Sequence, residues 1–146
     1  MDLWSLLASL LASLAALVPN GPWAQTLDDL DARRNHAFVT GDAGDLRTVY
    51  APGTSILAAD QRMLHGFGER DLEVDRVSVR LLRVEVLRER KAMVRLRVVD
   101  RLRPVRVRAP GGEWRLLPRD RPTERTIVLR RTAGGWRIAR ATRLAG

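Results

Sequence analysis

The chain has no cysteine, only two histidines, one tyrosine and a single lysine among its 26 basic residues. Without cysteine, disulfides, thiolate catalysis and cysteine zinc sites are excluded, and the redox compartment stays open. His36 and His65 stand apart from any cluster of carboxylates, so we expect both to be structural or surface residues. We therefore expect no metal site built by the protein and no cofactor.

Negative charge is scarce in the second half of the chain. Residues 1–60 hold three arginines and seven acidic residues, whereas residues 101–146 hold 13 arginines and three acidic residues. A net charge of +9 raises nucleic acid and anionic membranes as partners. The use of arginine in place of lysine, beside abundant alanine, valine, leucine and glycine, is typical of a GC-rich bacterial genome and favours a solvated surface. Few aromatic platforms for bases accompany the arginines, which makes nucleic acid unlikely as a partner.

The longest apolar stretch, residues 3–18, is closed by Pro19, Asn20, Gly21 and Pro22. Its leucines recur at spacings of three and four, which predicts an amphipathic helix. The stretch is shorter than the roughly 20 residues of a membrane span, but it suffices for the apolar part of a signal peptide. A docked or self-associating helix, a signal or membrane anchor, and a vector-derived extension are the alternatives for residues 1–22. The localisation therefore stays open between the cytoplasm and a membrane-associated or extracytoplasmic site.

Three helices are expected after this segment. The first is capped by Thr26 and ends at Gly41, because a side-chain oxygen satisfies free amides at a helix start and glycine tolerates the left-handed C-cap. The second runs over residues 42–49 and is capped by Asp42. The third runs over about 55–66 and carries spaced apolar residues.

From Val74 onward the apolar residues recur with a period of two, which predicts strands. The alternation changes phase near Leu81 and Leu82, which indicates a β-bulge. Short strands around Trp114 and over residues 125–131 and 136–142 complete the pattern. Helices followed by strands predict an α+β domain over residues 23–146, with an antiparallel sheet covered on one side by helices.

The stretch VRLRVVDRLRPVRVR, residues 94–108, contains six arginines and one carboxylate. In a strand, Asp100 shares a face with Val94, Leu96 and Val98, while the arginines take the other face. An inward carboxylate would have a raised pKa and could act as a general acid or base in a pocket. The alternative is a bulge or an ion pair between Asp100 and an arginine at the pocket rim. The outward arginines repel one another across strands, so a negatively charged protein or lipid partner would stabilise that face.

Two segments resemble a known family. The runs LDARRNHAFVTGDAGDLRTVYAPG (30–53) and ERTIVLRRTAGGWRIARATRL (124–144) resemble the opening helices and closing hairpin of the nuclear transport factor 2-like superfamily, which includes SnoaL-like and ketosteroid-isomerase-like proteins. The resemblance implies a cystatin-like cone, in which a strongly curved antiparallel sheet wraps around N-terminal helices and leaves a pocket at its wide end. In this chain the extra apolar helix would precede the cone.

The resemblance implies a fold more than an activity. The family's isomerases use a carboxylate base with an oxyanion hole built from a tyrosine and a protonated acid. Here Tyr50 is the only tyrosine, and no motif pairs an acid with it. We therefore predict a noncatalytic accessory domain whose pocket binds a small apolar molecule or whose surface binds a protein, including a second copy through the sheet. Candidate pocket residues are Tyr50, Phe67, Asp100, Trp114 and Trp136.

Two alternatives belong to other classes of protein. One is an isomerase, dehydratase or hydrolase in which Asp100 is the general base and Tyr50 donates a hydrogen bond. The other is a domain tethered to a membrane through residues 3–18. For Trp114 and Trp136, the alternative to a ligand contact is an ordinary place in the core.

Overall fold

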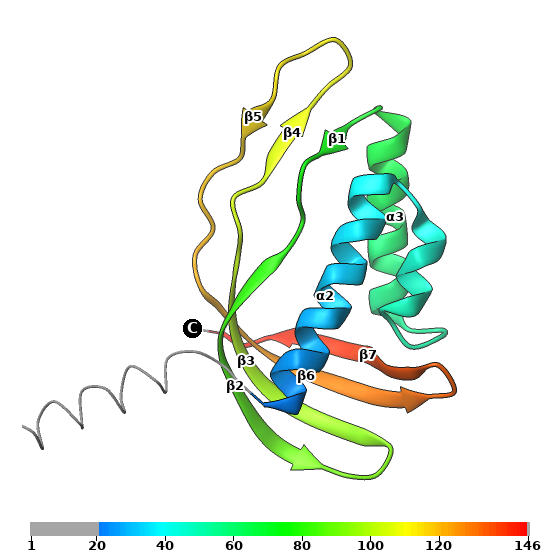
Figure 1. Cartoon of the computed structure of the whole chain (residues 1–146), viewed down its shortest axis with the longest axis vertical. Helices are drawn as coiled ribbons and strands as arrows, with labels where there is room; N and C mark the ends of the chain where they lie inside the picture. The colour runs from blue at the N-terminus through cyan, green and yellow to red at the C-terminus, as the bar shows by residue number, and fades with distance from the viewer. Residues whose placement is uncertain (1–20, 146) are drawn as a thin grey trace, which may run out of the picture.

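The computed structural model describes residues 21–145, in which helices precede strands (Figure 1). The helices are α2 (Pro22–Thr40), the short 3₁₀ helix η1 (Ala43–Thr48) and α3 (Ser55–Glu69). This order confirms the predicted α+β class. The apolar segment over residues 3–18 lies outside the described residues. None of the described helices is long and apolar enough to cross a bilayer.

The strands form two antiparallel sheets. The larger sheet has the order β2-β3-β6-β7 and the smaller one has the order β1-β4-β5. Their bounds are Glu73–Val74 (β1), Val79–Glu89 (β2), Met93–Leu102 (β3), Arg106–Arg108 (β4), Arg115–Leu116 (β5), Thr123–Thr132 (β6) and Gly135–Arg143 (β7). The long strands curve, and α2 and α3 lie on the concave side (Figure 1).

Helix α2 begins four residues before the predicted cap. Gly21, at a φ of 100°, is the N-cap and Pro22 occupies the first turn, where its fixed φ suits a helix and its missing N–H costs nothing. The Thr26 hydroxyl instead donates to the Pro22 carbonyl at 2.8 Å, so the cap prediction was wrong. The predicted end is confirmed, because Gly41 adopts the left-handed conformation and its amide donates to the Ala37 carbonyl.

The connection between η1 and α3 is anchored to the sheet. Asp42 caps η1 by accepting from the Gly44 amide, as predicted. The Ala51 amide donates to the Ile138 carbonyl at 2.8 Å, and the Ile138 amide donates to the Val49 carbonyl at 2.9 Å. These two bonds hold the intervening Tyr50 against β7, where it is buried. Helix α3 continues to Glu69, beyond the predicted end near residue 66.

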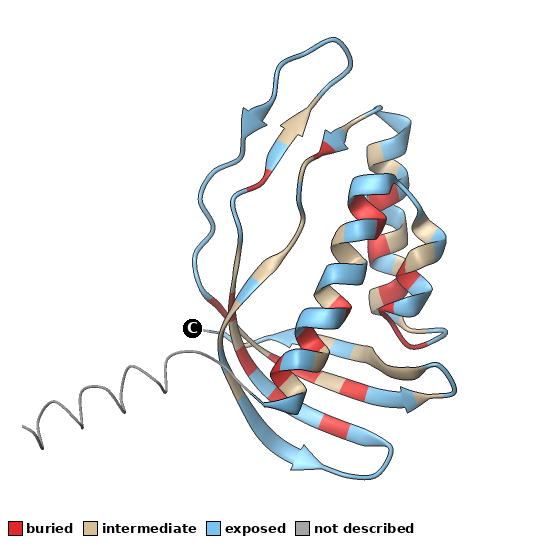
Figure 2. Cartoon of the chain, viewed as in Figure 1, coloured by how far each residue is buried: buried red, intermediate tan, exposed pale blue. Residues whose placement is uncertain are grey.

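The core lies between the helices and the concave face of the larger sheet (Figure 2). Strand β3 alternates as predicted, with Val94, Leu96, Val98 and Asp100 buried and the arginines between them exposed. A register shift between Leu81 and Arg83 confirms the predicted bulge in β2. The helices contribute buried side chains to the same cluster, including Leu27, Leu30, Phe38, Leu46 and Leu64.

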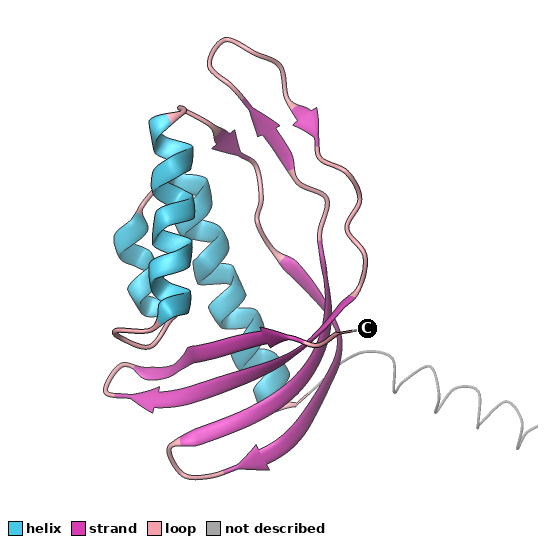
Figure 3. Ribbon diagram, turned by 180° about the vertical axis from the view of Figure 1, so that it is seen from behind, coloured by secondary structure: helices cyan, strands magenta, loops and turns pink. Residues whose placement is uncertain are grey.

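The two tryptophans of the strand region occupy different surroundings. Trp136 is half-buried and packs edge-to-face on Trp23, with ring centroids 5.0 Å apart. Trp114 is 38% exposed and lies beside β5, where the guanidinium groups of Arg106 and Arg108 stack over its ring. A core position was therefore a wrong prediction for Trp114, because the β4-β5 arm extends away from the helices (Figure 3).

Candidate functional site: the cone cavity

A cavity of about 440 Å³ lies between the helices and the concave face of the larger sheet. Its walls combine apolar side chains with charged ones from both layers. The apolar lining is Leu27, Leu30, Val49, Ile56, Val79, Leu81, Leu102, Ile127, Ile138 and Ala141, and the polar lining is Asp31, Arg34, Tyr50, Asp60, Asp100, Asp120, Thr123, Arg125 and Arg143.

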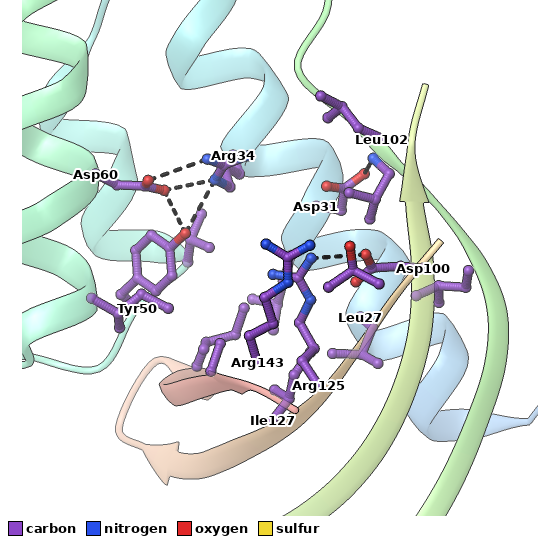
Figure 4. Close-up of a pocket in the computed structure, with 18 of the residues that line it drawn as sticks. Leu27, Asp31, Arg34, Tyr50, Asp60, Asp100, Leu102, Arg125, Ile127 and Arg143 are labelled. Carbon is purple, nitrogen blue, oxygen red and sulfur yellow. Dashed lines mark hydrogen bonds and ion pairs between the residues drawn. The ribbon is translucent and has the colours of Figure 1, made fainter. Parts of the chain in front are cut away.

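One polar cluster joins α2, α3 and the connection before α3 (Figure 4). The Arg34 guanidinium donates to both carboxylate oxygens of Asp60, at 2.6 and 3.2 Å, and its Nε also donates to the Tyr50 hydroxyl at 3.1 Å. The Tyr50 hydroxyl donates to Asp60 Oδ2 at 2.5 Å. Each of these three side chains is thus hydrogen-bonded to the other two.

The surroundings of this cluster shift the pKa values of Arg34 and Tyr50. Burial raises the pKa of the Tyr50 hydroxyl above its ordinary value, and this outweighs the opposing effect of Arg34. Burial by itself would lower the pKa of Arg34, but the hydrogen bonds and charges of Asp60 and Tyr50 raise it. Arg34 is therefore charged and Tyr50 is protonated at neutral pH, so the cluster links the two helices through a buried ion pair.

Asp100 faces the cavity and also forms an ion pair. Its side chain is only 6% exposed, and its Oδ1 accepts from Arg125 of β6 at 3.0 Å. Burial raises the pKa of the Asp100 carboxyl, while the charge and hydrogen bond of Arg125 oppose the rise. Asp100 thus lies on the cavity wall and also forms an ion pair with an arginine, so the two positions considered from the sequence occur at once.

Two arginines project from neighbouring strands toward the same part of the cavity (Figure 4). Arg125 of β6 and Arg143 of β7 are direct cross-strand partners. The Arg125 Nε is buried and has no hydrogen-bond partner in the described part of the chain. Arg143 is exposed and forms no ion pair with another described residue. This part of the cavity wall therefore carries two neighbouring guanidinium groups, and one buried N–H of Arg125 has no hydrogen-bond partner among the described residues.

Asp31 of α2 lines the cavity and, like Asp120, forms no ion pair with an arginine among the described residues. Its Oδ2 accepts a hydrogen bond from the Val79 amide at 3.1 Å. Burial raises the pKa of Asp31 to about 6, although the Val79 hydrogen bond and the charge of Arg34 lower it, and the nearby Asp100 charge adds to the rise. Such a carboxyl group exchanges protons close to neutral pH.

Of the five residues proposed from the sequence, Tyr50 and Asp100 line this cavity. They belong to separate clusters, since Tyr50 bonds to Asp60 and Asp100 bonds to Arg125. Phe67 packs edge-to-face on Phe38, with ring centroids 5.9 Å apart, and does not line the cavity. Trp136 and Trp114 do not line it either, because their contacts with Trp23 and with arginines place them elsewhere.

Sequence reasoning missed most of the charged lining: Asp31, Arg34, Asp60, Arg125 and Arg143. One signal was present, because Asp31 and Arg34 lie one turn apart on a helix and Arg34 falls on its apolar face. Among residues 21–145, no group of three or more histidines and acidic residues is arranged to hold a metal ion. His36 and His65 are exposed and lie near Asp45 and Glu69.

No protein-family model matches the sequence, and no curated protein does. Several solved structures share its architecture. The intermembrane space region of chloroplast protein ARC6 is 13% identical, covers 88% of this chain and 100% of its own, and gives a TM-score of 0.55. Aln2 from a Streptomyces species is 16% identical over 86% of this chain and 92% of its own, with a TM-score of 0.53.

A nuclear transport factor 2-like superfamily protein from Salmonella enterica serovar Typhimurium is 11% identical over 83% of this chain and 89% of its own, with a TM-score of 0.51. Likeness at such identities concerns the fold, which is the helix-filled, curved-sheet cone of cystatin-like proteins. The chain therefore shares the fold of these proteins, and this is the fold that the sequence resemblance implied.

Proposed function

We propose that the chain is a binding domain for a small molecule that has an apolar body and a hydrogen-bond-accepting end such as a carboxylate. The observation that carries the proposal is the buried Nε of Arg125, which has no hydrogen-bond partner within residues 21–145 and lies on the wall of a cavity of about 440 Å³. This volume lies within the roughly 300 to 1,000 Å³ that is usual for small-molecule sites.

The apolar part of the lining supports an apolar ligand body. Leu27 and Leu30 of α2 face Ile127, Ile138 and Ala141 of the sheet across the cavity. Such a surface stabilises a ligand by removing its apolar area from water, at about 25 cal/mol per Å². We therefore expect side chains of both α2 and the larger sheet to contact the ligand.

The charged part of the lining supports an accepting end near Arg125. Arg34 already donates to Asp60 and Tyr50, whereas the Nε of Arg125 has no hydrogen-bond partner and its neighbour Arg143 has no ion pair among the described residues. A planar carboxylate matches the fork of donors on a guanidinium group. We therefore expect the ligand's anionic end at Arg125 and Arg143.

The test uses 8-anilinonaphthalene-1-sulfonate, which combines an apolar body with an anionic end and fluoresces when shielded from water. Ala141→Trp fills the cavity from β7 and should abolish the fluorescence gain. Arg143→Gln should weaken binding about tenfold, because a hydrogen bond to a charged group is worth about 1.5 to 3 kcal/mol. Arg140→Gln, which removes the same charge from an exposed position on the same strand, is the control.

Dye binding that survives Ala141→Trp at full strength would contradict the proposal. Thermal unfolding of each variant shows whether it is folded, and a dye signal that rises while cooperative unfolding is lost is not counted as binding.

A second candidate function is an enzyme that transfers a proton within the same cavity. Asp31 favours it, because its carboxyl has a pKa of about 6, faces the cavity and has no arginine partner in residues 21–145. Asp100 and Tyr50, the pair considered from the sequence, are each engaged by another side chain. The geometry thus favours Asp31 over Asp100 as the base.

Deuterium incorporation into small enolisable ketones, followed by NMR, tests this candidate. Asp31→Asn should remove the exchange while dye binding persists, and Asp100→Asn should retain most of it. Exchange by the wild-type protein no faster than in buffer would eliminate proton transfer from these substrates and would leave the binding function intact.

A further inference from the structure

A second hollow, of about 570 Å³, lies where β3 leaves the larger sheet, between residues 102–105 and residues 116–120. Arg80 and Arg101 are cross-strand partners one residue away from the inward-facing Leu81 and Asp100, so they lie on the outer face of the sheet. We call this hollow the arginine groove. Its lining is Arg80, Arg101, Leu102, Arg103, Pro104, Val105, Leu116, Leu117, Pro118, Arg119 and Asp120.

The four groove arginines lack acidic partners. Within residues 21–145, none of Arg80, Arg101, Arg103 and Arg119 forms an ion pair or a side-chain hydrogen bond. Arg97, Arg106 and Arg108, by contrast, are paired with Glu124, Asp75 and Glu73. The groove therefore gathers four guanidinium groups without ion pairs to described residues around one recess.

Among the described residues, the acidic groups near the groove form no ion pair with its arginines. Asp120, the only carboxylate in the lining, accepts a hydrogen bond from the Leu102 amide at 2.8 Å. Burial raises the pKa of Asp28, and the charge of Arg103 opposes that rise without an ion pair. Neither carboxylate neutralises the four guanidinium groups.

The groove also exposes apolar surface between its charges. Leu116 is 67% exposed and Leu117 is 41% exposed, and Pro104 and Pro118 border them. Leu116 belongs to β5, which is the edge strand of the smaller sheet and pairs only with β4 among the described strands. Exposed leucines beside an edge strand are a surface that an extended chain can use.

We propose that the arginine groove binds an acidic, leucine-containing segment of a partner protein in extended conformation. Its carboxylates would contact the guanidinium groups, and its apolar side chains would cover Leu116 and Leu117. The groove adjoins the ligand cavity, because Leu102 and Asp120 line both, but its arginines do not line the cavity and the proposal does not depend on the function proposed for the cavity.

Other occupants fit less well. A second copy of this chain at the groove would bring arginines against arginines. Single-stranded nucleic acid requires stacking platforms, and none of the groove residues is aromatic. A planar membrane surface contacts protruding basic residues, whereas these arginines line a recess around apolar side chains. Charge and shape together thus favour an acidic peptide.

The test measures binding of a short fluorescent peptide of alternating glutamate and leucine by anisotropy, with the full chain. The double variant Arg101→Gln, Arg103→Gln should weaken binding about tenfold or more, because two charge-assisted hydrogen-bond sites are lost. Leu116→Asn should weaken it several-fold. The control Arg62→Gln, Arg90→Gln removes the same charge from exposed positions on α3 and in the β2-β3 turn, and should change binding less than about twofold.

Two further probes separate the sources of affinity. A peptide with serine in place of leucine retains every carboxylate and should bind more weakly than the parent, and one with glutamine in place of glutamate should not bind.

Equal weakening by the groove and control double variants would overturn the proposal, because it would indicate attraction to net charge alone. Absence of peptide binding, or groove-dependent binding of phosphatidylglycerol vesicles without peptide binding, would also overturn it. Dye binding in the cavity serves as an independent readout, since it should be unchanged in the groove variants.

Discussion

The two faces of the larger sheet carry the same kinds of charged residue in opposite surroundings. On the inner face, Asp100 and Arg125 form an ion pair on the wall of the cavity, with Asp100 almost fully buried. On the outer face, Arg97 pairs with Glu124 in solvent, and Arg101 has no acidic partner among the described residues. Adjacent residues of β3 therefore lie in different surroundings, because successive side chains of a strand point to opposite faces of the sheet.

The two faces indicate that burial, more than residue type, decides how much a charged side chain contributes to stability. A buried charge that loses its partner is left without water to compensate it, so inner-face substitutions should change stability strongly. An exposed pair is screened by water and salt and contributes little. Outer-face arginines should therefore act mainly through binding.

The sharpest test of the two faces is a pair of neighbouring positions in β3. Leu96 is completely buried, so Leu96→Ala should lower the free energy of unfolding by about 4 kcal/mol through lost burial and a residual cavity. Urea denaturation measures this change. Arg97→Ala, one residue away on the outer face, should leave the denaturation midpoint close to that of the wild type, and a comparable loss at both positions would break the comparison.

Removing the carboxylate of the inner cluster should have the next largest effect. Asp60→Ala leaves Arg34 buried without its anion, and we expect a loss of about 3 kcal/mol in the free energy of unfolding. Tyr50→Phe removes a single hydroxyl from the same cluster and should cost about 1 kcal/mol. If Asp60→Ala were no more damaging than Tyr50→Phe, the ion pair would not be what holds α2 to α3.

Asp31→Asn should act in the opposite direction and depend on pH. The pKa of Asp31 is raised from an ordinary value of 3.8 to about 6, so the folded chain holds this proton more tightly than the unfolded chain does. Asp31 therefore lowers stability as the pH rises from about 4 to about 6, by between about 2 and 3 kcal/mol in total. The asparagine variant should be more stable than the wild type by that amount at pH 8 and should lose the advantage near pH 4.

Urea titrations at several pH values measure this difference. Asp29→Asn, on the exposed side of the same helix, is the control and should differ from the wild type by less than about 0.5 kcal/mol at each pH. A stability difference for Asp31→Asn that does not vary with pH would contradict the burial of its carboxyl.

The smallest effect is expected on the outer face. Glu124→Gln breaks the exposed pair with Arg97 and should leave the denaturation midpoint unchanged at about 0.15 M salt, where screening is strong. The same variant should slightly strengthen the binding of acidic peptides, because it adds to the positive charge of that face. A large loss of stability would show that the outer pairs matter as much as the inner ones.

Much of the fold could be predicted from local patterns. The period of two in β3 predicted the inward position of Asp100, and the phase change at Leu81 predicted the bulge in β2. Gly41 predicted the end of α2, whereas Thr26 misled because proline and glycine earlier in the chain start the helix. Trp114 misled because apolar residue type does not reveal that a strand extends beyond the core.

The order of helices and strands, the two unlike faces of β3 and the inward carboxylate of Asp100 follow from periodicity and turn residues, which act over a few positions of the chain. Which charges meet depends instead on how distant segments pack. Asp60 joins Arg34 and Tyr50 across 26 and 10 residues, Asp100 joins Arg125 across 25, and the groove arginines come from separate segments. Such pairings depend on how a curved sheet closes over its helices, and no local pattern encodes that closure.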